Sequence, residues 1–253
     1  MKRFKAKVDS LQRIKKDVFL LRFSSKYLAT NTLPGQFIHL KIEAKSLLLR
    51  RPFSIHKIEK DTITILFRVR GKGTKILSEK RKGDSLDIVG PLGKGFDYAD
   101  LASKKKEIFL VAGGMGVAPL VFLAQRLKVT GTVLVGAATK KEIIGKQEFE
   151  KLGCKVMLAT EDGSSGFKGT VIDLLKKTLS KTKAAQVYAC GPHEMLAGLA
   201  KVIRGRRRVT AQVSFEQFMG CGIGVCRACV IKTHKGYRRI CKEGPVFHAM
   251  EVF

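Results

Sequence analysis

The hydrophobic pattern changes its period near residue 98, and this change constrains the fold more than any other feature of the chain. In residues 62–70, TITILFRVR, apolar side chains recur at alternate positions, which is the period of a half-buried strand. Residues 18–23, 37–42 and 85–89 carry similar short runs, separated by turn-forming sequences. Several short strands at this spacing predict a small antiparallel β-barrel over residues 1–98.

Beyond residue 98 the chain alternates between short apolar runs and helical patterns. The apolar runs cover residues 107–112, 132–137, 155–159 and 186–190, and the helical patterns cover residues 119–127, 141–149, 171–177 and 193–202. Because buried strands that alternate with helices form βαβ units, residues 99–212 are predicted to form an α/β domain with a parallel sheet. Residues 213–253 are rich in Gly and Cys and too few for another large core, which predicts a small C-terminal module.

Four cysteines in this module form the most specific motif of the chain. Cys221, Cys226, Cys229 and Cys241 follow the pattern C-x4-C-x2-C-x11-C. The first three have the spacing with which plant-type ferredoxins hold a [2Fe–2S] cluster. Interleaved glycines allow tight turns and let backbone N–H groups approach the sulfur atoms. We therefore expect the four cysteines to ligate a [2Fe–2S] cluster, the fourth from a distant strand.

Zinc and disulfide bonds are the alternative uses of these cysteines. Structural zinc sites usually combine two C-x2-C pairs, and this chain has one. Disulfides need an oxidising compartment, which nothing in the N-terminal sequence indicates. Both alternatives are less well supported than the cluster. Of the two remaining cysteines, Cys154 fits a small buried apolar residue.

Two motifs in the predicted barrel fit the binding of a flavin nucleotide. Residues 51–54 read RPFS, and residues 68–74 read RVRGKGT. A guanidinium group neutralises phosphate oxygens, while Gly and Thr offer N–H and hydroxyl donors at close range. A Ser hydroxyl beside an Arg can hydrogen-bond the edge of a flavin ring. Either motif alone is explained as well by a turn, but their order ahead of an α/β domain favours binding.

A glycine-rich loop follows the first strand of the predicted α/β domain. Residues 111–120, VAGGMGVAPL, expose backbone N–H groups and a helix N-terminus to a pyrophosphate, although they do not match G-x-G-x-x-G. Residues 190–192, CGP, close a later strand ahead of another helix. At the carboxyl ends of parallel strands, both loops face the crevice in which such sheets bind ligands.

In this order, the motifs R-P-x-S, G-x-G-T, GGxGxAPL and CGP resemble those of the ferredoxin–NADP reductase superfamily, which joins a flavin-binding barrel to a nicotinamide-nucleotide domain. The C-terminal sequence CGIGVCRACV…YRRICKEGPVF is similar, more specifically, to the electron-transfer subunits of class B dihydroorotate dehydrogenases. The segment ATEDG at residues 159–163 shares this similarity. The resemblance covers nearly the whole chain and implies an FAD-binding barrel, an NAD-binding α/β domain and a [2Fe–2S] module.

The resemblance also implies roles for individual residues. It assigns FAD binding to Arg51, Pro52, Phe53, Ser54, Leu66, Phe67, Arg68, Gly73 and Thr74, with Ser54 near the flavin N5 and Gly73 and Thr74 at the pyrophosphate. It assigns NAD binding to Gly113, Gly114, Gly116 and Cys190, with Cys190 near the nicotinamide ring. A buried core thiol is an equally simple explanation of Cys190.

Two departures from the family pattern bear on the sites. Many relatives place an Arg-Ser pair, which grips a 2′-phosphate, where this chain has Ala137–Lys141. The missing guanidinium favours NAD over NADP, although Lys140 or Lys141 could still meet a phosphate. Glu243 stands where an aspartate is common, and we expect this change to leave the cluster unaffected.

The implied activity is electron transfer. NAD(H) would exchange a hydride with FAD, FAD would exchange single electrons with the cluster, and the cluster would exchange them with FMN in a separate catalytic subunit. Dihydroorotate would be oxidised in that partner during de novo pyrimidine biosynthesis, with no dihydroorotate site on this chain. We expect a heterotetramer with two copies of each chain. The rival is the flavin and iron–sulfur subunit of an NADH-dependent ferredoxin:NADP transhydrogenase or a hydrogenase diaphorase.

Charge and hydropathy argue against nucleic-acid binding, a membrane span and secretion. The 49 Lys and Arg against 21 Asp and Glu give a net charge of +28, which attracts anions. The basic residues are spread along the chain, with tight runs only at 104–106 and 206–208 and no interleaved aromatics, so a cluster-bearing nucleic-acid binder is disfavoured. No apolar run approaches the roughly 20 residues of a membrane span, and the N-terminus lacks an apolar signal segment. We therefore expect a cytoplasmic protein.

Overall fold

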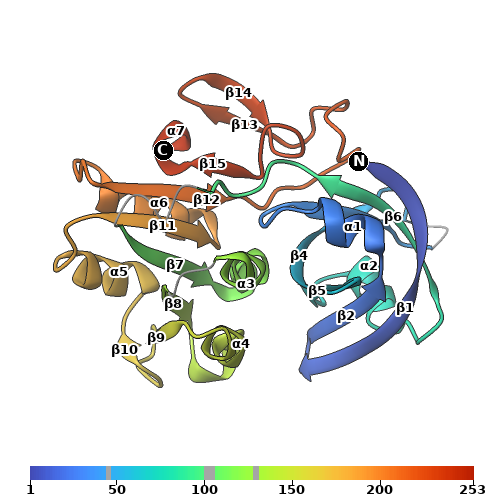
Figure 1. Cartoon of the computed structure of the whole chain (residues 1–253), viewed down its shortest axis with the longest axis horizontal. Coiled ribbons are helices and arrows are strands. Elements are labelled where there is room, and N and C mark those ends of the chain that lie inside the picture. Colours follow the sequence, from blue (N-terminus) through green and yellow to red (C-terminus); the bar gives the residue numbers. More distant parts are fainter. Residues whose placement is uncertain (44–46, 100–105, 128–130) are drawn as a thin grey trace.

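The computed structural model describes residues 1–43, 47–99, 106–127 and 131–253 (Figure 1). A barrel and an α/β domain lie side by side, and the C-terminal residues lie across both of them (Figure 1). Lys104 and Lys105, two members of a basic run noted in the sequence, lie outside the described residues. Within the part of the chain that is described, no helix is both long enough and apolar enough to cross a membrane.

The N-terminal residues form a closed barrel of six antiparallel strands, as predicted. Alternate side chains of its strands, among them Phe23, Ile38 and Ile65, fill the interior and are fully buried. Around the barrel the strands are β1 (Lys2–Lys15), β2 (Val18–Ser24), β5 (Thr62–Arg68), β4 (Arg51–Glu59), β3 (Phe37–Lys41) and β6 (Ser85–Leu92), with helices α1 (Lys26–Asn31) and α2 (Lys72–Leu77) in the connections.

The second domain is built on a largely parallel sheet, which confirms the predicted α/β class. In spatial order its strands are β10 (Phe167–Lys168), β9 (Lys155–Thr160), β8 (Thr132–Ala137), β7 (Glu107–Gly113), β11 (Ala185–Cys190), β12 (Val209–Ser214) and β15 (Val246–His248). All neighbours pair in parallel except β12 and β15, which are antiparallel. The chain order reverses between β7 and β11, so the loops after these two strands open a crevice.

Helices cover both faces of this sheet, because its strands are apolar on both sides. Phe109 and Val111 of β7 pack on one face with helices α5 (Val171–Leu179) and α6 (His193–Ile203). Ile108 and Leu110 pack on the other face with helices α3 (Val117–Arg126) and α4 (Lys146–Lys151). The second face is turned toward the barrel (Figure 1).

The prediction of a continuous helix over residues 141–149 is wrong. The chain forms a short 3-10 helix, η2 (Lys140–Glu142), and begins α4 only at Lys146. Gly145 separates the two with a left-handed backbone, φ +81°. A Cβ at this position would lie 3.3 Å from Cβ of Val117, so the chain turns here in close contact with α3.

The C-terminal residues do not form an isolated unit. After the hairpin β13 (Val230–Thr233) and β14 (Gly236–Arg239), strand β15 joins the edge of the large sheet and α7 (Ala249–Val252) packs against β12. The same segment meets the barrel side, because Lys94 and Pro245 form a β-bridge. The C-terminal segment therefore links the two larger domains.

Buried polar groups also connect the barrel to the α/β domain. Nδ1 of His56 lies 3.1 Å from the carbonyl oxygen of Ala118, and Nε2 lies 2.9 Å from Oε1 of Glu148. The side-chain amide of Gln125 accepts from the backbone N–H of Ile58 and donates to its carbonyl. These contacts join strand β4 to helices α3 and α4, so the strand that carries the RPFS motif is fixed to the second domain.

A buried carboxylate in the barrel is held by two arginines. Asp87 of β6 accepts hydrogen bonds from Nη2 of Arg3 at 2.8 Å and from Nη2 of Arg50 at 2.8 Å. Hydrogen bonds from Arg3, together with those from Arg50, lower the pKa of Asp87 to about 2, against the opposing effect of burial. Arg50 also donates to the Asp87 carbonyl, so the residue ahead of the RPFS motif is anchored to the neighbouring strand.

Replacing this carboxylate should destabilise the barrel in a pH-dependent way. The folded pKa lies below the ordinary value of 3.8, so the stabilisation is present above about pH 4 and is lost as the pH falls toward 2. We expect Asp87→Asn to lower the free energy of unfolding by about 2 kcal/mol at pH 7 and by about half as much at pH 3. Urea unfolding followed by circular dichroism, with Asp61→Asn in an exposed turn as control, measures both differences. An equal loss at the two pH values would contradict the assignment.

Candidate functional site

A cleft between the barrel and the α/β domain collects the residues expected to bind FAD. Seven of the nine line this cavity of about 450 Å³: Pro52, Phe53 and Ser54 from β4, Leu66, Phe67 and Arg68 from β5, and Thr74 from α2. The two strands are consecutive and pair antiparallel in the barrel, which brings the motifs together. The cleft therefore presents a hydroxyl, aromatic rings and guanidinium groups to one ligand.

The other two residues of the FAD set, Arg51 and Gly73, do not line this cleft but lie close to one another. A Cβ on Gly73 would be 3.6 Å from Nε of Arg51, so the guanidinium lies over the start of α2. The hydroxyl of Thr74 is already engaged, accepting from the N–H of Arg70 at 2.9 Å and donating to the carbonyl of Gly71. The Thr74 side chain thus shapes its own loop, and the side chain of Arg51 lies beside the backbone of Gly73.

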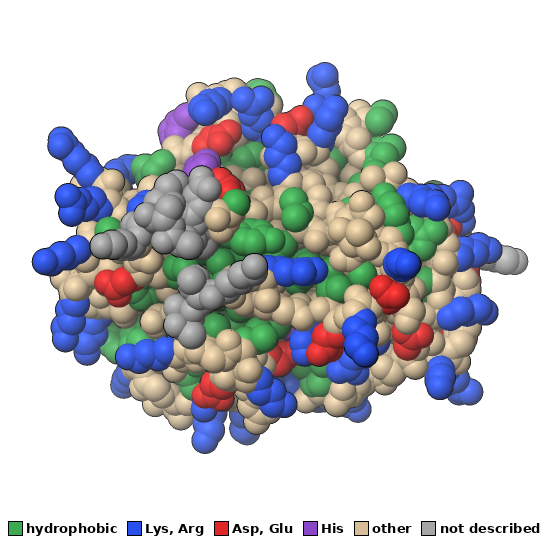
Figure 2. Space-filling model, viewed as in Figure 1, with side chains coloured by type: hydrophobic (Ala, Val, Ile, Leu, Met, Phe, Trp, Pro, Cys, Tyr) green, Lys and Arg blue, Asp and Glu red, His purple; other side chains and the backbone are tan. Residues whose placement is uncertain are grey.

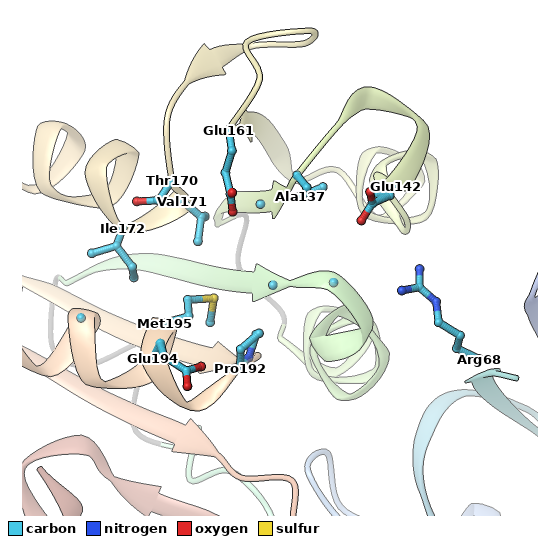
Figure 3. A pocket seen from close by; sticks show the side chains of 15 residues that line it. Arg68, Ala137, Glu142, Glu161, Thr170, Val171, Ile172, Pro192, Glu194 and Met195 are labelled. Atoms are coloured by element: carbon cyan, nitrogen blue, oxygen red, sulfur yellow. The ribbon is translucent and has the colours of Figure 1, made fainter. Parts of the chain in front are cut away.

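A second cavity of about 510 Å³ opens at the carboxyl ends of β7, β8 and β9 (Figure 3). Gly113 and Gly114 of the expected nucleotide loop line it, and Gly116 and Cys190 do not. Gly116 serves a different purpose, because a Cβ there would lie 2.0 Å from the carbonyl oxygen of Cys190. Only glycine lets the loops after β7 and β11 touch at the crevice.

Cys190 lines the flavin cleft instead of the nucleotide cavity. The thiol is buried, and burial raises its pKa well above the ordinary value, helped by the negative charge of Glu216. Cys190 therefore remains a neutral thiol in the wall of the flavin cleft.

Several residues that sequence reasoning missed complete the flavin cleft. The segment after β12 contributes Phe215, Glu216, Phe218 and Met219. Glu216 lines the cleft with an exposed side chain, and partial loss of water around its carboxyl group still raises the pKa of that group, against the opposing charge of Arg70. No motif marks this segment; the one available signal is its place at the carboxyl end of β12, a strand that the sequence analysis did not predict.

The four C-terminal cysteines come together as two pairs. The backbone N–H groups of Cys221 and Cys226 each donate to the sulfur of the other residue, at 3.3 and 3.4 Å, and the N–H of Cys241 donates to Sγ of Cys229 at 3.4 Å. In the described parts of the chain, no three His, Cys, Asp or Glu side chains surround a single point, as one zinc ion would require. In a [2Fe–2S] cluster each iron takes only two protein thiolates, so two neighbouring pairs fit that cluster.

Backbone N–H groups are aimed at the sulfur atoms of this loop. Sγ of Cys221 accepts from the N–H groups of Ile223, Val225 and Cys226 at 3.3–3.4 Å. Although partial burial opposes it, these bonds lower the pKa of Cys221 to about 6, which favours the thiolate that ligates iron. Sγ of Cys229 accepts from the N–H of Cys241 at 3.4 Å. The loop therefore favours a negative sulfur at Cys221, whereas burial raises the pKa of Cys241 to about 12.

His39, a histidine of the barrel, packs against the cluster loop. His39 of β3 is fully buried, and neither ring nitrogen makes a well-formed hydrogen bond among the described residues, although the backbone of Cys221 lies close to the ring. Burial lowers the pKa of His39 to about 4, so the imidazole is neutral. Its Nδ1 would be 2.4 Å from a Cβ on Gly222, which places the ring directly against the cluster loop. A buried polar group without a well-formed hydrogen bond at this place fits a site that is completed by a bound group.

A second support comes from the hairpin. Nη1 of Arg239 donates to the carbonyl of Gly224 at 2.8 Å, and Glu243 accepts from both the backbone N–H and the guanidinium of Arg239. Hydrogen bonding to Arg239 lowers the pKa of Glu243 to about 2. Glu243 thus acts on the loop through the arginine that it orients.

Glycine at position 222 should be required for cluster assembly. Gly222 (φ +71°) and Gly236 (φ +90°) both have left-handed backbones, but a Cβ on Gly236 would meet nothing within 4 Å. Alanine strains the backbone equally at both positions and collides with His39 only at Gly222. We expect Gly222→Ala to lower the iron and sulfide content severalfold and Gly236→Ala to retain it, as measured after anaerobic reconstitution. Equal cluster content in the two variants would show that the contact with His39 is unimportant.

Comparison with protein families divides the chain in the same order as its sites. Residues 5–98 match an oxidoreductase FAD-binding domain, residues 110–201 match an oxidoreductase NAD-binding domain, and residues 216–253 match the iron–sulfur cluster binding domain of dihydroorotate dehydrogenase B. The chain is accordingly an oxidoreductase with FAD, NAD and an iron–sulfur cluster, as expected.

Similar proteins point to the same enzyme system. The chain is 41% identical to the dihydroorotate dehydrogenase B (NAD(+)) electron transfer subunit of Desulforamulus reducens, over 98% of this chain and 97% of that protein. The corresponding subunit of Caldanaerobacter subterraneus subsp. tengcongensis is 39% identical, with 99% and 98% covered.

Solved structures show the same architecture. A structure of an NADH-dependent reduced ferredoxin-NADP oxidoreductase superposes with a TM-score of 0.87 at 28% identity, covering 98% of this chain and 89% of that one. A ferredoxin NADP+ reductase from Neisseria gonorrhoeae, at 16% identity and a TM-score of 0.70, shares the fold. The higher identity of the dihydroorotate dehydrogenase relatives decides against the transhydrogenase alternative. By sequence identity over nearly its whole length, the chain belongs to the family of electron transfer subunits of NAD-dependent dihydroorotate dehydrogenase B.

Proposed function

We propose that this chain conducts electrons between NAD and the FMN of a dihydroorotate dehydrogenase catalytic subunit, in a heterotetramer with two copies of each chain. The division into residues 1–98 for FAD, 99–212 for NAD and 213–253 for the cluster is part of the proposal. The main support for this proposal is that the flavin cleft lies beside both the nucleotide cavity and the cluster loop. Arg68 lines both the flavin cleft and the nucleotide cavity, so the two sites adjoin.

The flavin cleft also adjoins the cluster loop. Phe218 and Met219 line the cleft and lie immediately before the first cluster cysteine, Cys221. On the barrel side, Phe37 lines the cleft and its ring meets that of His39, which packs against Gly222. A ligand in the cleft therefore lies between the nucleotide and the cluster. When bound there, a flavin can take two electrons from NADH and release them singly.

Residues of this chain prepare the cleft for that exchange. Ser54 and Cys190 line its wall from the barrel and from the α/β domain, and we propose that they contact the facing rings of flavin and nicotinamide. Arg51 and the backbone of Gly73 would neutralise the FAD pyrophosphate, and Gly113 and Gly114 would hold that of NAD. Gly116 sets the close contact of the loops after β7 and β11 that brings the two cavities together.

The cluster loop offers one edge to a partner. Cys229 and Cys241 are buried, whereas Cys226 is exposed. Val225, next to Cys226 in sequence, is 75% exposed, and Phe218, in the segment before the loop, is 91% exposed. Exposed apolar side chains at a redox loop fit a docking surface for the catalytic subunit, because an electron has to leave where its acceptor can approach.

Reconstitution with the catalytic subunit tests this function. Loaded with FAD and cluster, the chain should oxidise NADH with an artificial acceptor by itself. Reduction of NAD+ by dihydroorotate should appear only when the catalytic subunit is added, and sedimentation should then report two copies of each chain. Absence of dihydroorotate-dependent NAD+ reduction in the mixed proteins would refute the proposal.

A charge introduced at the docking surface should impair electron exchange with the catalytic subunit without affecting NADH oxidation by the isolated chain. We expect Val225→Glu to reduce the dihydroorotate-dependent rate at least tenfold and to leave NADH oxidation by the isolated chain near wild type. Met250→Glu, at an exposed position on α7, is the matched control and should affect neither rate. Equal losses in both variants would place the partner elsewhere.

A further inference from the structure

The nucleotide cavity has a charge opposite to that of the protein as a whole. Lys and Arg are spread over the face shown in Figure 2, in keeping with the net charge of +28. The cavity, by contrast, is lined by three carboxylates, Glu142, Glu161 and Glu194, and by one cation among the described residues, Arg68. An acidic lining in a basic protein is unexpected at a site for an anionic dinucleotide, and it calls for a specific explanation.

Two of the three carboxylates have a role in the chain itself. Glu194 lies in the first turn of α6, where a negative charge is stabilised by the helix dipole. Glu142 lies on the barrel side of the cavity, close enough to Lys15 to favour its charged form. Glu161 has neither role: in the described part of the chain its carboxylate makes no ion pair and no hydrogen bond.

The backbone nevertheless fixes Glu161 in place. It directly follows β9, and its N–H donates to the carbonyl of Ala137 at the end of β8 at 3.2 Å. The N–H of Asp162 donates to the carbonyl of Ala138, also at 3.2 Å. Figure 3 shows the Glu161 side chain pointing into the cavity, near Ala137 and Val171. The carboxylate is thus held toward the space that a ligand would occupy.

The position of this carboxylate along the sheet identifies the part of NAD that would meet it. Cys190, at the end of β11, faces the flavin cleft, so the nicotinamide end has to lie on that side. Gly113 and Gly114, at the end of β7, would meet the pyrophosphate. The other half of the dinucleotide then extends toward β8 and β9, where Ile172 offers apolar surface to a purine. Glu161 lies at that end, which is the adenosine end.

We infer that Glu161 selects NAD over NADP at this site, by accepting hydrogen bonds from the hydroxyls of the adenosine ribose and by repelling a 2′-phosphate. The inference rests on the proposed function, in which this cavity holds NAD. A carboxylate is an acceptor only, so it pairs with ribose hydroxyls and opposes a phosphate that carries up to two negative charges. Lys140 and Lys141, which follow β8 and could otherwise meet a phosphate, do not line the cavity.

The substitution Glu161→Gln tests this role, because glutamine keeps the size of the side chain and removes its charge. We expect the ratio of kcat/KM for NADPH to that for NADH to rise at least tenfold, through a gain with NADPH and a loss with NADH. The assay is oxidation of each nucleotide by the FAD-loaded chain with an artificial acceptor. Raising the salt concentration should narrow the wild-type preference, because exposed charges are screened. Glu107→Gln, at the amino end of β7, is the matched control and should leave the ratio unchanged.

An unchanged ratio in Glu161→Gln would overturn the inference, and so would an equal change in Glu194→Gln. Calorimetric titration of NAD+ and NADP+ into the same proteins gives a second readout that does not depend on electron transfer. If the wild-type chain binds NAD+ more tightly than NADP+ but does not oxidise NADH, the proposed function fails while the titration still decides the role of Glu161.

Discussion

The pairing of β15 with β12 is the contact on which the arrangement of the three sites depends. Residues 216–244 leave the large sheet after β12, form the cluster loop and hairpin, and return as β15. The base of this excursion is closed twice, because the N–H of Phe215 donates to the carbonyl of Pro245 at 2.9 Å and the N–H of Lys94 donates to the carbonyl of Gly244. A Cβ on Gly93 would lie 2.6 Å from that same Gly244 oxygen, so barrel and cluster segment touch through backbone. The cluster loop is therefore held over His39 at a fixed place beside the flavin cleft.

Burial distinguishes the two pairs of cluster cysteines, and charge distinguishes the nucleotide cavity from the rest of the surface. One cysteine pair lies in the apolar core with Ile240, while the other pair reaches the surface at Cys226. The cluster site therefore has one pair of ligands inside the protein and one pair at the surface, where apolar side chains are exposed. At the opposite end of the proposed electron path, the carboxylates of the nucleotide cavity work against a basic surface that would otherwise attract any anionic nucleotide. The net positive charge of the protein raises the rate at which anions encounter it, and Glu161 selects NAD over NADP among the nucleotides that arrive.

Much of this architecture was predictable because it depends on local patterns. The alternation of apolar runs with helices predicted the parallel sheet, and the spacing of Cys221, Cys226, Cys229 and Cys241 predicted a cluster ligand set that the structure gathers as two pairs. The long strand β1 was missed because its residues are mostly polar and partly exposed, which hides the strand period. The break at Gly145 was missed because its cause, close contact with Val117, is tertiary.

The residues that the sequence could not predict are those whose role arises between domains. His39 reads as an ordinary strand residue until the cluster loop is placed on it. Glu216 reads as a loop carboxylate until β12 aims it into the flavin cleft, and β12 itself became recognisable only through its pairing with β11 and β15. Glu161 belongs to a segment noticed for its resemblance to relatives, but its direction into the cavity follows from the hydrogen bond to Ala137. In each case the informative contact joins segments far apart in the chain.

In the proposed electron path, the flavin cleft stands between the nucleotide cavity and the cluster. Anaerobic rapid mixing of the loaded chain with NADH tests it most directly, with the flavin and cluster absorbance followed separately. If electrons pass through FAD, the flavin absorbance should fall before the cluster absorbance. In FAD-depleted protein, the cluster should stay oxidised until FAD is restored. Reduction of the cluster by NADH at the same rate with and without FAD would contradict it.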